Sequence, residues 1–313
     1  MNQNLLKNGL YNTAAGIIRI GLGLLTIPVL IRLLGVEEYG LWTLAVTVIV
    51  IVTLAESGLS LATTMFVSQD VERNDVQGLS QTLTITAGAM LILSVLAGLF
   101  LWVFAAPIVG GFTKLQPSQQ VVVTEALKLG AVVVWARLLQ QVLVGVEQAC
   151  QRYDLSNAIA TLQALALNIG MLVVVLSGGK TVALMQWQIW IAVGGLLAHC
   201  WLNWFLLKKF GISINWNPQR GLAIFRYSMM SWLTAMGGVL FSQMDKVIVG
   251  AALGASELGI YAAVTNVTNQ INVLSALPVQ PMMPALSALA ASDDFDPVLV
   301  EEPVPDASGE PGE

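Results

Sequence analysis

Ionisable side chains interrupt several long apolar segments of the sequence, and they have the chemistry to bind a polar ligand. Arg19 lies in the apolar segment 9–31, with Asn12 seven residues earlier on nearly the same helical face. Arg137 lies near the middle of the segment 121–144. An ionisable group at bilayer depth usually faces a bundle interior or a wet cavity. Arg137 is therefore a candidate for a cationic side chain that lines a cavity. Arg19 either binds a ligand or makes a structural contact with helix carbonyls or with Glu56.

Three further ionisable residues are candidates for ion coupling or a conformational ion pair. Glu56 lies in a Glu-Ser-Gly context that could end or kink a helix, so it either titrates as a coupling site for H⁺ or Na⁺ or makes a local hydrogen bond. Asp245 and Lys246 are adjacent, and 3.6 residues per turn separates them by about 100°. One of them could pair across to another part of the bundle while the other extends toward the interface.

Amide side chains form a stripe on one face of the segment 258–286. The stripe contains Asn266, Asn269 and Gln270. Such a stripe can join transmembrane helices through hydrogen bonds, or it can line a polar path, and the sequence leaves both readings open.

The composition indicates that lipid surrounds the elements that carry these residues. Hydrophobic residues make up 56% of the 313, charged residues only 11%, and the mean hydropathy is +0.75. Soluble domains have about 25% charged residues. We expect an all-α integral membrane protein with about eight transmembrane helices, because a helical span needs about 20 apolar residues. The expected spans are 9–31, 41–66, 83–108, 121–144, 157–176, 184–207, 227–253 and 258–286.

The Lys and Arg residues of the expected loops predict an orientation. One side has six of them and the other has three, Arg32, Lys114 and Lys180. Because cytoplasmic loops are enriched in Lys and Arg, the richer side, which includes the N-terminus, should be cytoplasmic. With eight spans the C-terminus lies on the same side. We expect a multi-pass protein of a bacterial-type plasma (inner) membrane.

The sequence lacks the motifs that are typical of enzymes, metalloproteins and nucleic-acid-binding proteins. Cys150, Cys200 and the single histidine, His199, have no metal-ligand spacing. Neither a Walker loop nor a hydrolase motif is present in the sequence. Clustered Lys and Arg typical of nucleic-acid binding are also missing from it. We expect no cofactor, no metal and no catalytic activity, with the lipid bilayer as a partner.

A nine-residue pattern occurs twice. Residues 34–42 and 253–261 both read L-G-x-x-E-x-G, followed by Leu or Ile and then Trp or Tyr. Glycine permits a positive φ at a helix end, and an acid favours the start of the next helix. Six expected spans separate the copies, so both face the same side of the membrane. This predicts a parallel repeat about an axis along the membrane normal.

These residues carry a resemblance to a family. The sequence resembles the polysaccharide transporter family, the lipid-linked oligosaccharide flippases of the multidrug/oligosaccharidyl-lipid/polysaccharide exporter superfamily. The resemblance covers residues 1–290. Its positions are Asn12, Arg19, Pro28, residues 32–35, 39–41 and 56–59 in the first part, and residues 225–228, 245–250, 253–254, 259–261, 281 and 284–287 in the second.

The resemblance implies a function. It implies two six-helix lobes around a central cavity, alternating access, and a polyprenyl-diphosphate-linked oligosaccharide as cargo. Arg19 and Arg137 would then bind the diphosphate, and Asn266 and Asn269 the sugar. Other polysaccharide assembly proteins are possible partners, and an ion gradient would drive transport. The alternatives are a multidrug or metabolite antiporter of the same superfamily and a truncated, non-transporting membrane protein.

The resemblance also divides the chain. We expect a complete six-helix lobe at 1–209, an interlobe linker at 210–226, and the first hairpin of a second lobe at 227–290, where the family has further helices. This predicts a chain truncated in its second lobe. Residues 291–313 contain eight acidic residues and no basic residue, so we expect a disordered acidic tail.

Overall fold

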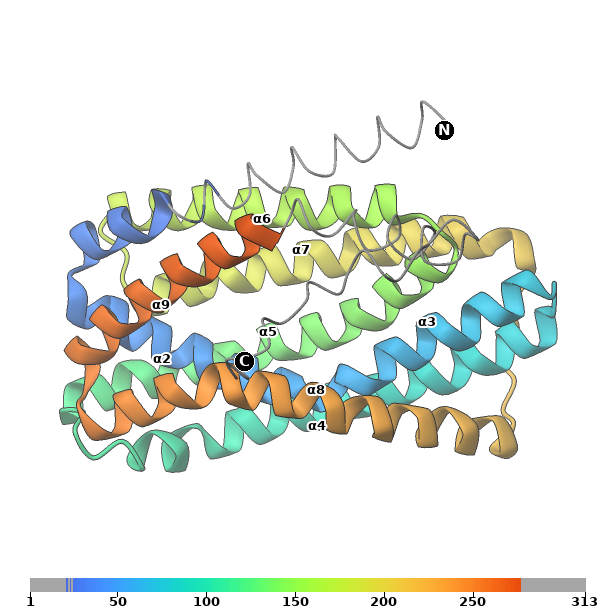
Figure 1. The fold of residues 1–313 in the computed structure, drawn as a ribbon, viewed down its shortest axis with the longest axis horizontal. Coiled ribbons are helices and arrows are strands. Elements are labelled where there is room, and N and C mark those ends of the chain that lie inside the picture. The colour runs from blue at the N-terminus through green and yellow to red at the C-terminus, as the bar shows by residue number, and fades with distance from the viewer. Residues whose placement is uncertain (1–20, 22, 24, 277–313) are drawn as a thin grey trace, which may run out of the picture. The chain divides into compact units, whose positions relative to one another are not determined.

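The computed structural model describes residues 21, 23 and 25–276, and every regular element in this part of the chain is helical (Figure 1). This confirms the all-α fold class. Arg19, Asn12 and the acidic tail 291–313 lie outside the described residues. The elements are α2 (Val36–Thr53), η1 (Leu54–Glu56), α3 (Ser57–Glu72), α4 (Val76–Gly110), α5 (Pro117–Ala149), α6 (Tyr153–Leu176), α7 (Thr181–Leu207), η2 (Lys208–Phe210), α8 (Pro218–Ala252) and α9 (Ala255–Ala276).

Five described helices are long and apolar enough to cross a membrane by length and composition. They are α2, α4, α5, α6, and α7 together with η2; a shorter apolar helix covers Leu25–Leu34. The helices α8 and α9 contain 35 and 22 residues, which is long enough, but they do not meet the same criterion for apolar composition. A multi-pass membrane protein follows from these helices. The count of eight spans stays a prediction.

The second expected span is two α-helices in sequence. The helix α2 ends at Thr53, a single 3₁₀ turn covers Leu54–Glu56, and α3 begins at Ser57. The α-helix is therefore interrupted at Glu-Ser-Gly, where the sequence predicted that it could end or kink. Figure 1 shows α2 and α3 as consecutive segments that lie beside α8.

The helix α8 begins at Pro218, nine residues before the apolar segment that the sequence suggested. The Asn217 side chain accepts hydrogen bonds from the backbone N–H of Gln219 and Arg220. Proline is suited to the first helical position, where its missing N–H would have no helical partner. This cap starts the helix within the polar stretch, and it leaves residues 211–217 as the extended connection from η2.

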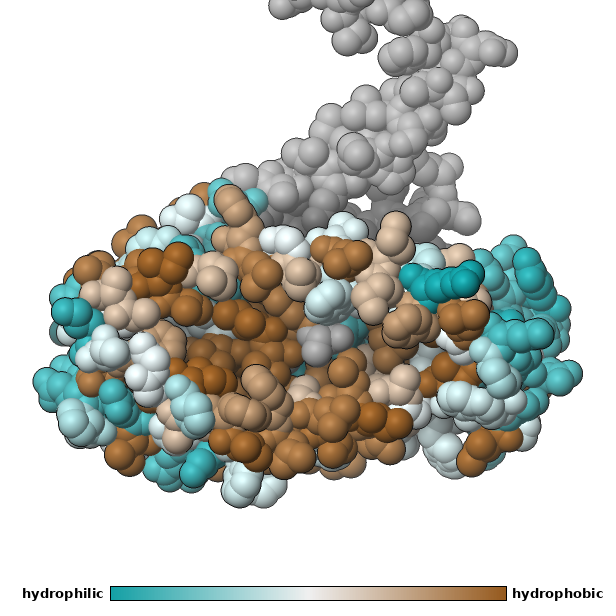
Figure 2. All heavy atoms as spheres, turned by 90° about the horizontal axis from the view of Figure 1, so that it is seen from below, coloured by the Kyte–Doolittle hydropathy of each residue, from teal (hydrophilic) through white to brown (hydrophobic). Residues whose placement is uncertain are grey.

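The core is built around α5. This helix packs against α2, α3, α4 and α7, and the largest buried cluster includes Leu44, Met90, Leu127, Leu138 and Met185. The outer faces of α4 and α8 are also apolar. In Figure 2, brown apolar residues cover the middle of one face, and teal polar residues gather at its two ends. An exposed apolar belt of this kind is expected where lipid covers the surface.

The two copies of the nine-residue pattern contact each other where α2 and α9 begin. A Cβ atom on Gly40 would collide with the carbonyl oxygen of Ala255, and one on Gly259 would collide with that of Val36. Gly40 and Gly259 are equivalent positions of the repeat, and so are Val36 and Ala255. Reciprocal contacts of this kind are what a two-fold axis between the copies produces. We call these four residues the glycine crossing.

A second, polar contact joins α8 to α3 and α4. Arg220 forms an ion pair with Asp70, and its Nε donates to Thr82 Oγ1 at 2.8 Å. Thr82 Oγ1 in turn donates to Asp70 Oδ2 at 2.7 Å, and Asp70 is buried. We call Asp70, Thr82 and Arg220 the linker clamp. The connection before α8 follows α4 as well, since the N–H of Asn215 donates to Thr84 Oγ1.

The helices up to Gln270 form one compact unit, and a second unit starts at Ile271, of which only the residues up to Ala276 are described. The lobe and linker boundaries expected from the sequence stay a prediction.

Candidate functional site

A polar cavity of about 450 Å³ lies among α5, α6 and α7. We call it the Arg137 cavity, and its polar lining includes Arg137, Gln140, Gln141, Asn157, Gln163 and His199. Two of the amides are held in place: Gln140 Nε2 donates to the carbonyl of Ala192 at 2.6 Å, and Gln163 Nε2 donates to Gln140 Oε1 at 3.3 Å. These hydrogen bonds fix polar groups on three helices around one space.

Arg137 is the charged group that the lining presents. Within the described part of the chain, its guanidinium makes no ion pair and no hydrogen bond. A guanidinium at bilayer depth without an acidic partner needs water or an anionic ligand, because its desolvation is costly. The cavity is therefore suited to a ligand that carries negative charge.

A second, smaller pocket of about 190 Å³ is formed by residues far apart in the sequence. We call it the amide pocket, and its polar and aromatic lining includes Tyr39, Trp42, Asn168, Asn266, Asn269 and Gln270. Asn266 Nδ2 donates to the Tyr39 hydroxyl at 3.2 Å. The buried Trp42 Nε1 has no hydrogen-bond partner among the described residues.

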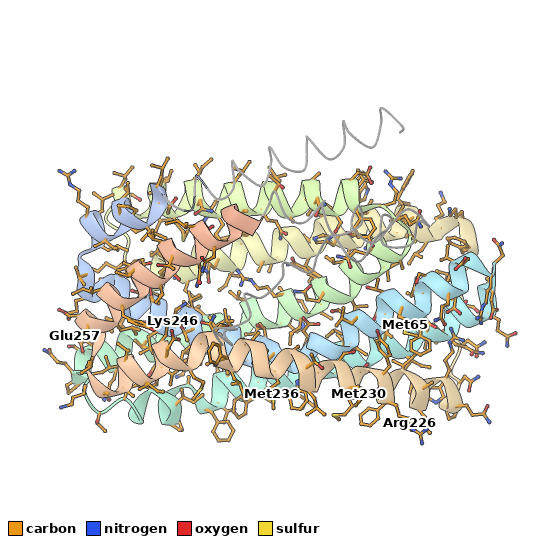
Figure 3. All side chains as sticks on the ribbon, viewed as in Figure 1. Met65, Arg226, Met230, Met236, Lys246 and Glu257 are labelled. Carbon is orange, nitrogen blue, oxygen red and sulfur yellow. The ribbon has the colours of Figure 1, made fainter. Side chains whose placement is uncertain are left out.

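Asp245 and Lys246 support the amide pocket from α8. Lys246 Nζ donates to Asn266 Oδ1 at 3.3 Å, and Asp245 Oδ2 accepts a 2.7 Å hydrogen bond from the hydroxyl of Tyr261. Figure 3 labels Lys246 in the part of α8 that lies beside α9. As the sequence indicated, the two side chains do not face one another: each has its own partner on α9. Their role in coupling stays a prediction.

The two spaces share a wall. Residues of α6 line both, with Gln163, Ala164 and Leu167 at the Arg137 cavity and Asn168 and Met171 at the amide pocket. Successive turns of one helix therefore pass from a cationic space to a space with amides and aromatic rings.

The sequence grouped Arg137, Asn266 and Asn269 as cavity residues, and the structure places Arg137 in one space and the two amides in the other. Glu56 lies elsewhere, in the turn between α2 and α3. It is buried, and its Oε2 has no hydrogen-bond partner in the described part of the chain. Its role in coupling also stays a prediction.

Sequence reasoning missed a buried acid–base pair beside the Arg137 cavity. His199 Nδ1 lies 2.9 Å from Glu147 Oε1, and Asn203 Nδ2 donates to the same oxygen at 2.8 Å. The signal that could have indicated the pair is the spacing of His199 and Asn203, four residues apart in the otherwise apolar second half of α7.

A hollow larger than both of these spaces lies elsewhere in the described part of the chain. Its volume is about 590 Å³, between α4 and α5, and its lining is apolar apart from Glu125, Lys128 and Ser94. It opens on the apolar outer face of α4, where Trp102 is exposed. We place the candidate site at the Arg137 cavity and the amide pocket because both combine several polar groups with enclosure by three or more helices.

Comparisons with known proteins agree with this architecture. One solved structure, described as "protein A", has 12% sequence identity and a TM-score of 0.67, and the match covers 87% of this chain and 64% of that one. A second is an inward-facing multidrug resistance MATE family transporter of the MOP superfamily, with 17% identity, a TM-score of 0.60, and coverage of 90% and 61%. At such identities the likeness shows the fold.

The chain thus spans less than two thirds of the length of both proteins. No curated protein sequence matches it. The model of one family, described as polysaccharide biosynthesis protein, matches residues 5–290. Since this match covers most of the chain, the protein belongs to the polysaccharide biosynthesis protein family.

Proposed function

We propose that this chain acts in the transport of a polyprenyl-diphosphate-linked oligosaccharide across a bacterial plasma membrane, as a flippase in surface polysaccharide biosynthesis. The observation that carries the proposal is the Arg137 guanidinium, which lines a polar cavity inside a helix bundle without an acidic partner among the described residues. A diphosphate supplies the missing charge, and the guanidinium fork matches the geometry of phosphate oxygens.

The amide pocket supports a glycan as the other part of the cargo. Sugar hydroxyls donate and accept hydrogen bonds, and Asn266, Asn269 and Gln270 can do both. The rings of Tyr39 and Trp42 supply apolar surface in the same pocket. A cargo with a diphosphate beside its first sugars fits two adjoining spaces along α6.

We further propose that an ion gradient drives transport, since the sequence contains no nucleotide-binding loop. The termini would be cytoplasmic, as the loop charges predict. Because the chain spans less than two thirds of the solved structures that it matches, activity with a further chain or with other polysaccharide assembly proteins belongs to the same proposal.

A multidrug antiporter is the second candidate. The likeness in fold to a multidrug MATE transporter favours it. An organic cation as substrate would need an acidic cavity, and the Arg137 cavity presents a cation instead. The two candidates therefore differ in the sign of charge that the ligand must carry.

Binding of undecaprenyl diphosphate to the 313-residue protein in liposomes tests the proposal. Arg137→Gln should weaken binding about 10- to 100-fold, because a hydrogen bond to a charged group contributes about 1.5–3 kcal/mol. Lys128→Gln is the matched control: it removes a cation of the same helix that lines the apolar hollow, and it should leave the affinity unchanged.

Equal affinity of the Arg137→Gln variant and the parent protein would reject the diphosphate site. Tight binding of ethidium with no binding of undecaprenyl diphosphate would favour the antiporter. Complementation of a flippase-deficient strain then asks whether this chain suffices for transport, with surface polysaccharide as the readout.

A further inference from the structure

Glu147 and His199 form a fully buried pair between α5 and α7. The Glu147 side chain is 0% exposed and that of His199 is 2% exposed. The carboxylate accepts from His199 Nδ1 at 2.9 and 3.1 Å and from Asn203 Nδ2 at 2.8 Å. Asn203 is held in turn, since its Nδ2 also lies 3.2 Å from the carbonyl oxygen of Leu143.

This arrangement exceeds what is needed to join two helices. Amide pairs hydrogen-bond across transmembrane helices without burying a charge, as Gln140 and Gln163 do in the same bundle. A buried carboxylate costs several kcal/mol unless it is protonated or paired with a cation. Binding or loss of a proton at this pair therefore changes the net charge of a buried site, where the electrostatic energy of that charge is large.

Of the two residues of the pair, His199 lines the Arg137 cavity and Glu147 does not. Nδ1 is occupied by the carboxylate, and Nε2 makes no hydrogen bond within the described residues. Nε2 of His199 is therefore the ring nitrogen that remains free to take up a proton at the residue bordering the cavity.

We propose that Glu147 and His199 form a proton-binding site that sets the charge of the Arg137 cavity. With Nδ1–H donated to an ionised Glu147 and Nε2 unprotonated, the pair carries one negative charge, which offsets Arg137. A proton added at Nε2 makes the pair neutral and leaves the cavity with the charge of Arg137. Proton uptake therefore favours an anionic ligand, and proton loss favours its release. This inference rests on the proposed function, because it names the coupling site of the same cavity.

The groups around the pair leave this assignment intact. On α5 the charged group that lines the cavity is Arg137. Cys150, which follows α5, lies within electrostatic range of the charged groups Glu147 and Lys209. The helix α3, which also packs against α5, presents the neutral Ser60, Thr63 and Thr64 at Gly145. The polar lining groups of α6 are Ser156, Asn157 and Gln163, all uncharged. His199 is the only histidine among the residues that line the cavity.

The chain contains a single histidine, so its protonation can be read without assignment. The experiment is solid-state NMR of ¹⁵N-histidine-labelled protein in liposomes between about pH 5 and pH 9. We expect one Nε2 signal that titrates in this range. Glu147→Gln removes the ionised acceptor, so it should move the titration to lower pH.

Glu125→Gln is the matched control, because it removes an acid of α5 that lines the apolar hollow rather than the Arg137 cavity. It should leave the His199 titration unchanged. An Nε2 signal that stays constant over the whole range, or equal titrations in the two variants, would overturn the proton site. A shift of the signal on replacing choline by Na⁺ at fixed pH would overturn it in favour of a metal-cation site.

Sulfate binding to the same liposomes tests the coupling, since sulfate keeps its charge over this pH range. A unit charge about 10 Å away at an effective dielectric constant of about 20 changes affinity by about tenfold or more. We expect sulfate affinity to fall by about this factor as pH rises through the titration, and this dependence should vanish in His199→Gln.

Sulfate binding with no pH dependence in the parent protein would overturn the coupling. No sulfate binding at any pH, together with a normal His199 titration, would reject the anion site of the proposed function and retain the proton site. The two failures are therefore distinguishable.

Discussion

At the glycine crossing, α2 and α9 meet backbone to backbone, whereas at the linker clamp α3, α4 and α8 meet through charged and hydroxyl side chains. The crossing depends on missing atoms, because a Cβ on Gly40 or Gly259 would collide with a carbonyl oxygen. The clamp depends on a buried acid, because Asp70 is only 4% exposed and its partner Arg220 is 22% exposed. Both contacts join α8 and α9 to the preceding helices, yet they should respond to opposite kinds of substitution.

The largest effect is expected at the clamp. Arg220→Ala leaves the buried Asp70 without its cation, and losing one partner of a buried pair costs about 3–5 kcal/mol of unfolding free energy. Thermal unfolding in detergent measures the loss. Arg226→Ala on the same helix is the control, since Arg226 is exposed and points away from the bundle in Figure 3. Similar losses in the two variants would show that the ion pair does not hold α8.

The crossing should respond to a single added methyl group. Gly40→Ala forces α2 and α9 apart, and overpacking of this kind costs about 1–3 kcal/mol. Gly237→Ala in α8 is the control: nothing lies within 4 Å of its added Cβ, so the variant should gain about 0.5–1 kcal/mol from helix propensity. A gain of stability in Gly40→Ala as well would contradict the close approach of the two backbones.

The reciprocity of the crossing predicts that its two substitutions are not additive. Once Gly40→Ala has separated the helices, Gly259→Ala should cost less than it does alone. Coupling between contacting residues is about 0.5–3 kcal/mol. A double-mutant cycle on the same unfolding assay measures it. Additive losses within about 0.5 kcal/mol would mean that the two glycines act at separate contacts.

The smallest effect is expected at the start of α8. Asn217→Ala removes the cap of the first turn, and loss of such a cap costs about 1 kcal/mol. Its side chain also donates to Gln81 Oε1 at 3.1 Å, so the connection to α4 weakens too. Hydrogen exchange of the first α8 amides should rise in this variant. Unchanged exchange there would argue that Pro218 alone sets the helix start.

Long apolar segments predicted the helices well, because the bilayer requires them, and Glu-Ser-Gly indicated the break before α3. The start of α8 was harder to predict. The cap at Asn217 carries the helix through polar residues that apolar periodicity does not record.

Polar residues in apolar segments indicated Arg137 and the amides of α9 as candidate site residues. The Glu147–His199 and Asp70–Arg220 pairs join residues 52 and 150 positions apart, so only the packing of the helices brings them together. Apart from the spacing of His199 and Asn203, the sequence carries no local signal for these pairs.

The reciprocal contacts of the glycine crossing restrict how its two helices can move. If α9 slid along α2, the approach at Gly40 would open while the approach at Gly259 closed, or the reverse. Closing either gap presses backbone on backbone, so sliding is resisted in both directions. Rotation of one helix relative to the other about an axis through the crossing changes the distances at Gly40 and Gly259 by equal and small amounts. The repeat thus gives the molecule a fulcrum, about which helices can swing while their point of contact stays fixed.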